Sequence, residues 1–355
     1  MSSASDKNSG AGPVRAAHLF DVANLERYFA AHAPEIKSPV EVQQFKGGQS
    51  NPTYLLNAGG KKYVLRRKPP GNLLPSAHAV DREYRIMHAL RDTDVPVPRM
   101  LCLCEDSNVI GTPFYVMECI DGRILWDPDL PDMTPEQRRA HYRELNRAIA
   151  ALHSVDPAKV SLSDFGKPGG YVERQIARWI KQYRAAETER IEAMENLIEW
   201  LPKNIPQNAT SSLTHGDYRF DNVIFHPTEP RILAIIDWEL STIGDPIADF
   251  VYHCMKYRLP GGPIEKLSDA EKIKLGIPTL DEYCRMYCEF TGRSEVPNFD
   301  FYMAFGMFRL VGILQGIVKR ALDGNASSAN ALESGKRARP MAEAGWQQAL
   351  RVINK

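Results

Sequence analysis

The sequence has 355 residues, of which 43% are hydrophobic and 25% are charged, an ordinary composition for a globular protein with one large domain or two smaller ones. Lys and Arg together number 44, and so do Asp and Glu, so the formal net charge is zero at pH 7. This balance argues against a nucleic acid or an anionic membrane surface as a partner.

The first part of the chain predicts a sheet. Residues 1–14 are mostly small and polar and are expected to be disordered, and residues 19–31 have helical spacing. Apolar runs predict five strands, at residues 40–45, 53–56, 61–67, 100–104 and 114–119. The loop between the first two strands contains Gly47, Gly48, Gln49, Ser50 and Asn51. Glycine would let its backbone approach a ligand closely, although such a loop is also an ordinary turn.

A helix predicted at residues 76–90 carries Glu83 within its apolar stripe. A carboxylate that faces inward needs a partner, and Arg66 in the third strand is the predicted one. Lys68 lies on the same face of that strand and is the alternative cation. Two simpler interpretations stay open: Glu83 could extend to solvent, and residues 66–68 could form a solvated basic edge strand.

The second part of the chain predicts helices. The pattern changes at residues 120–128, so the expected domains are 15–120 and 121–355. Residues 134–137 have the form of a capping box, and further helices are predicted at 171–183, 189–201, 281–290, 301–322 and 329–353. Arg309 and Gln315 interrupt the longest apolar stretch, residues 301–318, which favours a buried helix over a membrane span.

The six cysteines include no Cys-x-x-Cys pair. That pattern is typical of reduced thiols and predicts a cytoplasmic location. Cys284, Cys288 and His253 could instead hold zinc, although zinc sites usually contain two closely spaced ligand pairs.

Polar residues gather in two nearby stretches. Residues 214–222 read Thr-His-Gly-Asp-Tyr-Arg-Phe-Asp-Asn, and residues 235–239 read Ile-Ile-Asp-Trp-Glu. The segment between them predicts a hairpin with its turn at 227–230. Asp217 and Asn222 would then share a loop, and Asp237 would end the returning strand. Oxygen ligands without a thiol suit Mg²⁺.

These motifs resemble a known family. His215-Gly216-Asp217, Asn222, residues 236–239 and 244–246, and Asp249 are similar to the aminoglycoside phosphotransferase family of small-molecule kinases. The closest likeness is to the kinase-like domain fused to some acyl-CoA dehydrogenases, and it runs from about residue 45 to residue 250. It implies an α+β, bilobal, protein-kinase-like fold. The N-terminal lobe would hold a five-stranded antiparallel sheet with one key helix, and the C-terminal lobe would be mainly helical with the catalytic hairpin.

The resemblance also implies roles in phosphoryl transfer from ATP, a reaction that depends on positioning and charge neutralisation. Asp217 would be the base that orients and deprotonates an acceptor hydroxyl. Asn222 and Asp237 would hold Mg²⁺. Arg66, in place of the usual lysine, would pair with Glu83 and bind the α- and β-phosphates.

The resemblance suggests roles for several other residues, and for some of them a simpler structural interpretation is also open. The loop 47–51 would cover the phosphates, and the backbone near Glu118 and Ile120 would read the adenine edge. His215 is expected to hold the loop by hydrogen bonds. Arg219 could neutralise the transferred phosphoryl group or an acidic acceptor, or be a surface arginine. Asp249 could accept backbone N–H bonds from the loop or be a first-turn helix carboxylate.

Two further features of the sequence resemble parts of kinases. Residues 164–166, Asp-Phe-Gly, copy a kinase metal-binding triplet but precede the catalytic loop, so a turn is predicted there. Glu239 could be a second carboxylate near the metal or merely exposed.

Three functions are compatible with this pattern. The first is an ATP- and Mg²⁺-dependent kinase for a small-molecule hydroxyl, with a hydroxy acid or hydroxyacyl-CoA as the first acceptor to test. The second is a nucleotide-binding pseudokinase that regulates or scaffolds a partner, favoured only by arginine at position 66. The third is a metal-dependent hydrolase, which would need a second cluster of ligands. The sequence carries no indication of oligomeric state.

Overall fold

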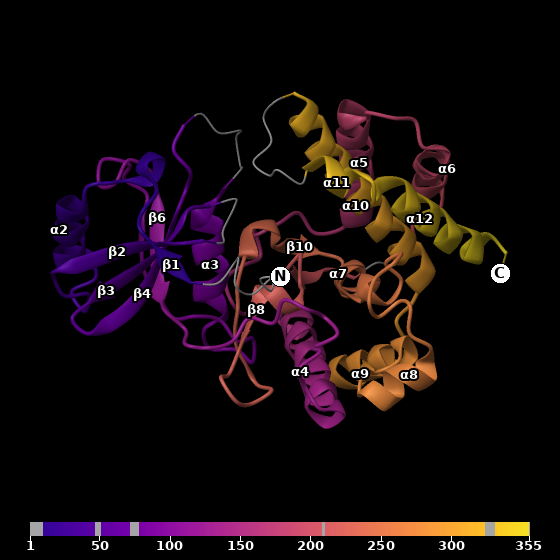
Figure 1. The fold of residues 1–355 in the computed structure, drawn as a ribbon, viewed down its shortest axis with the longest axis horizontal. Helices are drawn as coiled ribbons and strands as arrows, with labels where there is room; N and C mark the ends of the chain where they lie inside the picture. Colours follow the sequence, from indigo (N-terminus) through magenta and orange to yellow (C-terminus); the bar gives the residue numbers. More distant parts are fainter. Residues whose placement is uncertain (1–9, 47–50, 72–77, 208–209, 324–330, 355) are drawn as a thin grey trace. The chain divides into compact units, whose positions relative to one another are not determined.

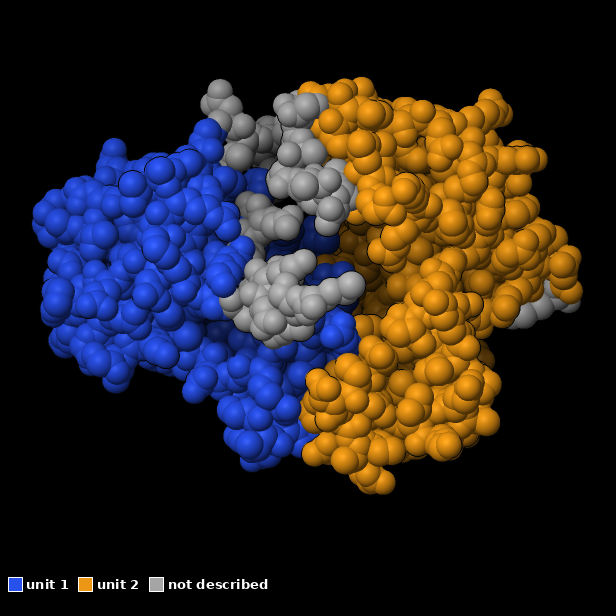
Figure 2. All heavy atoms as spheres, in the orientation of Figure 1, with its two compact units in different colours: residues 1–127, 160–162, 219–241 blue, residues 128–159, 163–218, 242–355 orange. Residues whose placement is uncertain are grey.

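The computed structural model describes residues 10–46, 51–71, 78–207, 210–323 and 331–354, and the chain forms two compact units (Figures 1 and 2). Unit 1 contains residues 1–127, 160–162 and 219–241, and unit 2 contains residues 128–159, 163–218 and 242–355. These units differ from the expected domains of 15–120 and 121–355, because residues 219–241 pack with the N-terminal part of the chain.

Unit 1 is built on a six-stranded antiparallel sheet in the order β1-β2-β3-β4-β6-β5. The strands are β1 (Ala11–Gly12), β2 (Val40–Phe45), β3 (Thr53–Ala58), β4 (Lys61–Arg67), β5 (Met100–Cys104) and β6 (Phe114–Glu118). The five predicted strands are present, and β1 is a sixth that pairs with the end of β2. The expectation of disorder is therefore wrong for residues 11 and 12, because a two-residue strand shows no alternation in the sequence. Residues 1–9 lie outside the described ranges.

The sheet packs against helix α2 (Val22–His32), which follows the 3₁₀ turn η1 (Ala16–His18). Leu25 and Phe29 of α2 join Tyr54 of β3 in one hydrophobic core. Gly59 and Gly60, which connect β3 to β4, have φ values of +56° and +74°, and a two-residue hairpin turn requires such positive values. Helix α3 (Val80–Leu90) also belongs to this unit.

The predicted hairpin completes unit 1. Strand β8 (Val223–Phe225) pairs antiparallel with β9 (Ile232–Ile235), between the turns η3 (Phe220–Asn222) and η4 (Trp238–Leu240). Backbone bonds attach it to the N-terminal part: the Ile235 N–H donates to the Pro96 carbonyl over 2.8 Å, and Arg123 and Phe225 exchange two bonds of 2.8 Å. Gly122 permits this approach, since a Cβ there would lie 2.4 Å from the Phe225 carbonyl oxygen.

Unit 2 is mainly helical. Its helices are α4 (Pro135–Ser154), α5 (Tyr171–Ala186), α6 (Glu192–Trp200), α7 (Pro246–His253), α8 (Asp269–Leu275), α9 (Leu280–Thr291), α10 (Phe299–Leu322), α11 (Ala331–Gly335) and α12 (Ala338–Ile353). Short 3₁₀ turns η2 (Leu201–Lys203) and η5 (Cys254–Tyr257) and a two-stranded sheet of β7 (Ser212–Thr214) and β10 (Thr242–Gly244) complete it. The predicted capping box is present, with reciprocal bonds between Thr134 and Gln137.

Helix α10 lies in the core of unit 2, where it packs against α5, α7 and α12 (Figure 1). Its length and composition would suit a membrane span, but 67% of its most apolar window is buried inside the protein. We therefore interpret α10 as a core helix, as the sequence predicts.

Candidate active site

Arg66 and Glu83 form a buried ion pair in unit 1. Arg66 lies in β4, and its Nε is 3.3 Å from Oε2 of Glu83 in α3. The Arg66 side chain is 11% exposed, and the Glu83 side chain is 0% exposed. The structure thus contains the predicted pair between strand and helix, and Glu83 does not extend to solvent.

Two further donors satisfy the Glu83 carboxylate. The Asn51 amide donates to Oε1 over 2.8 Å, and the Tyr115 hydroxyl donates to Oε2 over 3.0 Å. Burial raises the pKa of the Glu83 carboxyl, while the charge of Arg66 opposes this shift. Asn51 is itself fully buried, so it orients Glu83. The other four residues of the predicted phosphate loop, 47–50, lie outside the described ranges.

The two cations that follow Arg66 in the sequence have other partners. Arg67 is buried and donates to the carbonyl groups of Ile110 and His18 over 3.0 and 2.9 Å. Lys68 pairs with Asp81 at 3.9 Å. Because β4 lies between β3 and β6, the interpretation of residues 66–68 as a solvated edge strand is wrong.

Glu83→Ala is expected to lower the free energy of unfolding by about 3–5 kcal/mol, because it removes one partner of a buried charge. Asp81→Ala is the matched control on the same helix. Its pair with Lys68 is long and partly exposed, so we expect a loss below about 0.5 kcal/mol. Urea denaturation of both variants measures the difference, and equal losses would contradict a structural role for the Glu83 carboxylate.

Asn222 and Asp237 lie at the same end of the hairpin. Val223 pairs with Ile235, and the Ile236 N–H donates to the Asn222 carbonyl over 3.0 Å. The hairpin therefore brings the residues that flank its strands together, as predicted. Asp237 has φ 65° and ψ 57°, a left-handed conformation that a non-glycine residue rarely adopts.

Arg66 also contacts Asp237. Its Nη2 is 2.7 Å from Oδ1 of Asp237 and 4.0 Å from Oε2 of Glu239. One guanidinium group thus joins the helix carboxylate to a predicted metal ligand. The amide oxygen of Asn222 and the carboxylate of Asp237 are hard oxygen donors, and this donor set fits Mg²⁺.

The backbone after β6 leaves one predicted hinge donor unpaired. The Glu118 N–H donates to the Arg99 carbonyl over 2.9 Å, and the Glu118 carboxylate accepts from the Arg99 N–H over 2.7 Å. The Ile120 N–H has no hydrogen-bond partner within the described ranges. Ile120 is therefore the better candidate to read an adenine edge.

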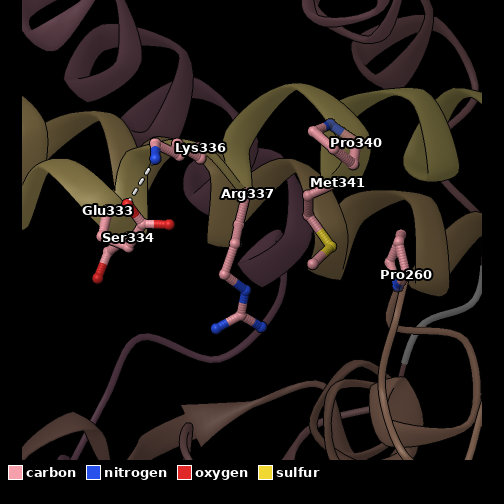
Figure 3. Close-up of a pocket in the computed structure, with 7 residues that line it drawn as sticks. All are labelled: Pro260, Glu333, Ser334, Lys336, Arg337, Pro340 and Met341. Atoms are coloured by element: carbon pink, nitrogen blue, oxygen red, sulfur yellow. Dashed lines mark ion pairs between the residues drawn. The ribbon is translucent and has the colours of Figure 1, made fainter.

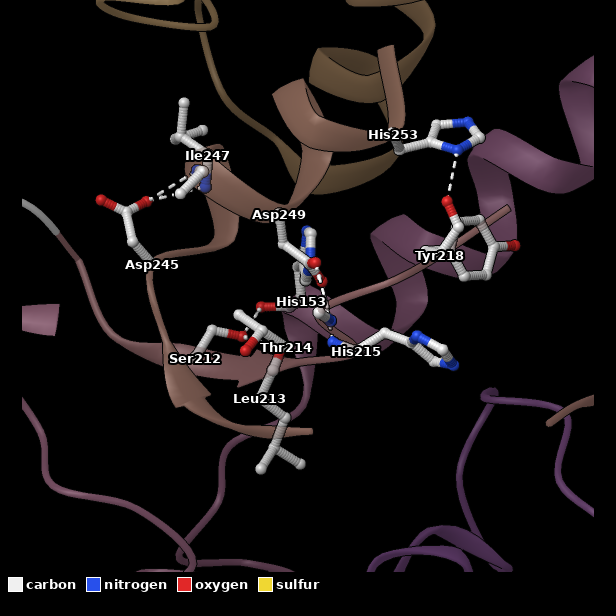
Figure 4. Close-up of polar contacts among 12 residues, drawn as sticks. His153, Ser212, Leu213, Thr214, His215, Tyr218, Asp245, Ile247, Asp249 and His253 are labelled. Carbon is white, nitrogen blue, oxygen red and sulfur yellow. Dashed lines mark hydrogen bonds and ion pairs between the residues drawn. The ribbon is translucent and has the colours of Figure 1, made fainter. Parts of the chain in front are cut away.

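In unit 2, Asp249 holds the loop that carries Asp217 (Figure 4). Its Oδ2 accepts from the His215 N–H over 2.8 Å, and its Oδ1 accepts from the Gly216 N–H over 2.9 Å. His153 Nε2 lies 3.2 Å from Oδ2. Burial alone would raise the pKa of the Asp249 carboxyl, but His153 and the backbone donors lower it overall. The structure therefore favours the bracing role over that of a simple helix carboxylate.

The loop itself has a defined conformation. Gly216 has φ +85°, which favours glycine. The Asp217 N–H donates to Nδ1 of the buried His215 over 3.2 Å, so the histidine contributes to the loop structure as predicted. Asp245 caps helix α7 by accepting from the N–H groups of Ile247 and Ala248.

Other predicted residues have mainly structural surroundings. Arg219, in unit 1, pairs with Asp221 at 2.8 Å, and its side chain is 54% exposed, which favours a surface arginine. Phe165 is fully buried in unit 2. A Cβ on Gly166 would lie 2.4 Å from the Thr242 hydroxyl oxygen, so close packing explains this glycine and the segment is a turn.

The cysteines do not form a metal site in the described part of the chain. All six are free thiols, and within the described part of the chain no group of three His, Cys, Asp or Glu side chains could hold a metal ion. The described structure therefore does not support zinc at Cys284, Cys288 and His253.

A hollow of about 440 Å³ lies elsewhere in unit 2 (Figure 3). Its lining residues are Pro260, Glu333, Ser334, Lys336, Arg337, Pro340 and Met341. None of the candidate site residues is among them, so we do not assign this hollow to the active site.

Three residues near the loop could not be identified as part of the site from the sequence: His153, Lys256 and Arg309. Lys256 Nζ is 2.8 Å from His253 Nε2 and 4.8 Å from the ring centroid of Tyr283. The other ring nitrogen of His253 donates to the Tyr218 carbonyl, directly after Asp217, over 2.9 Å. Burial lowers the pKa of Lys256 to about 7. A lone lysine in a helical sequence gives no signal of such a contact.

Lys256→Met is expected to flatten the pH dependence of stability. The unfolded lysine binds more protons than the folded one between about pH 7 and the usual value of 10.5. Wild-type stability should therefore rise with pH across this interval, by about 1–3 kcal/mol from this group. Urea denaturation at several pH values tests this, with the exposed Lys203→Met as control. The same slope in Lys256→Met and wild type would contradict the expectation.

Comparison with known proteins shows the family of this chain. Residues 41–292 match the model of the phosphotransferase enzyme family. Acyl-CoA dehydrogenase family member 10 of Mus musculus is 50% identical over 342 residues, which are 96% of this chain and 32% of that protein. Acyl-CoA dehydrogenase family member 11 of Homo sapiens is 40% identical over 95% of this chain and 44% of its own length. The chain thus spans less than half the length of these relatives.

Solved structures of phosphotransferases share the fold of this chain. A Ralstonia eutropha protein assigned to the aminoglycoside phosphotransferases is 52% identical, with a TM-score of 0.86 over 94% of this chain and 99% of that one. Aminoglycoside phosphotransferase APH(4)-Ia, in complex with ADP and hygromycin B, shares the fold at 15% identity, with a TM-score of 0.59 over 92% of this chain and 98% of that one.

The fold is therefore the α+β, protein-kinase-like fold of the aminoglycoside phosphotransferases. The chain belongs to the phosphotransferase enzyme family, whose members are small-molecule kinases that transfer phosphate to hydroxyl groups.

Proposed function

We propose that this protein uses ATP and Mg²⁺ to phosphorylate a hydroxyl group of a small molecule. The observation that carries the proposal is the buried ion pair between Arg66 of β4 and Glu83 of α3. A strand cation paired with a helix glutamate is the kinase arrangement that positions ATP phosphates.

Each candidate residue then has a role. Arg66 would bind the α- and β-phosphates, for which its fork of donors is suited. Asn222 and Asp237 would hold Mg²⁺, which would neutralise charge on the phosphate oxygens. Asp217 would orient the acceptor hydroxyl and accept its proton, and the Ile120 N–H would bind the adenine edge.

The acceptor we propose is a hydroxy acid or a hydroxyacyl-CoA rather than an aminoglycoside. The support is the similarity of nearly the whole chain to part of proteins named acyl-CoA dehydrogenase family members. A cytoplasmic location follows from the cysteine pattern and stays a prediction.

Acceptor-stimulated release of ADP tests this function. We expect Mg²⁺-dependent turnover with at least one hydroxy acid or its CoA ester, and little with aminoglycosides. Nucleotide binding without turnover on any acceptor would favour the second candidate, a pseudokinase. The observation that favours the pseudokinase is the 2.7 Å contact between Arg66 and Asp237, which engages a predicted metal ligand.

A further inference from the structure

Arg309 brings a positive charge from the core helix α10 to the loop that carries Asp217. Its Nη2 donates to the carbonyl oxygen of Gly216 over 2.9 Å. Both residues belong to unit 2. The sequence shows Arg309 only as an interruption of an apolar stretch, whereas the structure places its guanidinium one residue from the proposed base.

Two aromatic rings hold this guanidinium. Its Cζ lies 4.4 Å from the ring centroid of Tyr252 in α7 and 5.7 Å from that of Trp179 in α5. Gly312, one turn along α10, makes room for the indole, since a Cβ there would lie 3.1 Å from Trp179 Cε3. Side chains from two other helices, α5 and α7, therefore set the position of Arg309, and cation–π contacts of this kind stabilise a partly desolvated charge.

Arg309 nevertheless has no anionic partner in the described ranges. No carboxylate lies within ion-pair distance of it, and its Nε is buried without a hydrogen-bond partner. The nearby Asp249 is occupied by His215, Gly216 and His153. The indole nitrogen of Trp179 is likewise buried and unpaired. Unpaired donors around a partly buried cation cost free energy unless an anion binds there.

We propose that Arg309 binds an anionic oxygen group of the phosphoryl acceptor, a carboxylate or a phosphate, and thereby places the acceptor hydroxyl at Asp217. Arginine suits this role because its planar donors match carboxylate and phosphate oxygens. A cationic acceptor such as an aminoglycoside would meet a like charge at this position. The inference rests on the proposed phosphotransfer function and specifies the charge of its acceptor.

Binding can be measured apart from turnover. The 355-residue protein, saturated with Mg²⁺ and ADP, is titrated calorimetrically with inorganic phosphate and with 3-hydroxybutyrate, in wild type, Arg309→Gln and Arg309→Lys. We expect wild type to bind at least one of these anions, and Arg309→Gln to bind it about 10–100-fold more weakly. Arg309→Lys should be intermediate. No anion binding by wild type at millimolar concentration, or equal binding by wild type and Arg309→Gln, would overturn the proposal.

Turnover gives the second readout. The specificity constant for 3-hydroxybutyrate is compared with that for its methyl ester, which lacks the charge. Arg309→Gln should lose most of the preference for the acid and change the ester value little, while the exposed Arg178→Gln should keep the preference. If Arg309→Gln weakens Mg²⁺–ATP binding and leaves anion binding intact, the anion at Arg309 belongs to the nucleotide and the proposal is wrong. Anion binding through Arg309 without turnover on any acceptor would count instead against the proposed kinase function.

Discussion

Asp217→Asn is expected to reduce acceptor-dependent turnover by about 10²–10⁴-fold, the usual contribution of a general base. Asparagine has nearly the same shape but cannot accept the proton of the acceptor hydroxyl. The loop around it should persist, because Asp249 holds the backbone N–H groups of His215 and Gly216. The loss should therefore fall on kcat, and the affinity for ATP should stay within about threefold of wild type.

A carboxylate in the same segment provides the control for this variant. Asp221 pairs with Arg219 at 2.8 Å and has no proposed part in proton transfer. Asp221→Asn should therefore keep most of the wild-type kcat. Steady-state measurement of ADP release compares the two variants. Equal turnover of Asp217→Asn and wild type would show that Asp217 is not the base.

Features set by nearby residues could be predicted from the sequence. The inward position of Glu83 follows from the helical period of its neighbours, and the hairpin that places Asn222 beside Ile236 follows from two short apolar runs and a turn. The capping residues Thr134 and Asp245 also follow from local preferences. In each case the interacting groups lie within about one turn or one hairpin of each other, and a local pattern specifies them.

Contacts between distant residues could not be predicted in this way. Asp249 depends on His153, which lies 96 residues away, and Arg66 contacts Asp237 across 171 residues. Arg309 reaches the carbonyl of Gly216 across 93 residues, and an arginine in an apolar helix has many possible partners. For the same reason, the sequence predicts Asn51 only as part of a loop over the phosphates and gives no sign of its hydrogen bond to Glu83. Such contacts depend on tertiary packing rather than on spacing.

Asp237→Ala is expected to weaken Mg²⁺-dependent ATP binding by at least about 100-fold, because even residues that only support a metal ligand contribute 10–100-fold to metal affinity. The fold should survive this change. The Asp237 side chain is 34% exposed, and Arg66 keeps its pair with Glu83. Glu239→Gln is the matched control from the same turn, since Glu239 lies 4.0 Å from Arg66, and it should weaken binding by less than about tenfold.

Calorimetric titration with ATP, in the presence and absence of Mg²⁺, tests the central claim most directly when wild type and Asp237→Ala are measured together. The proposed site predicts that wild type binds ATP only with Mg²⁺ and that Asp237→Ala loses this binding while keeping its folded circular dichroism spectrum. Absence of binding by wild type at millimolar ATP, or equal binding by the variant, would contradict a kinase site at Arg66, Asn222 and Asp237.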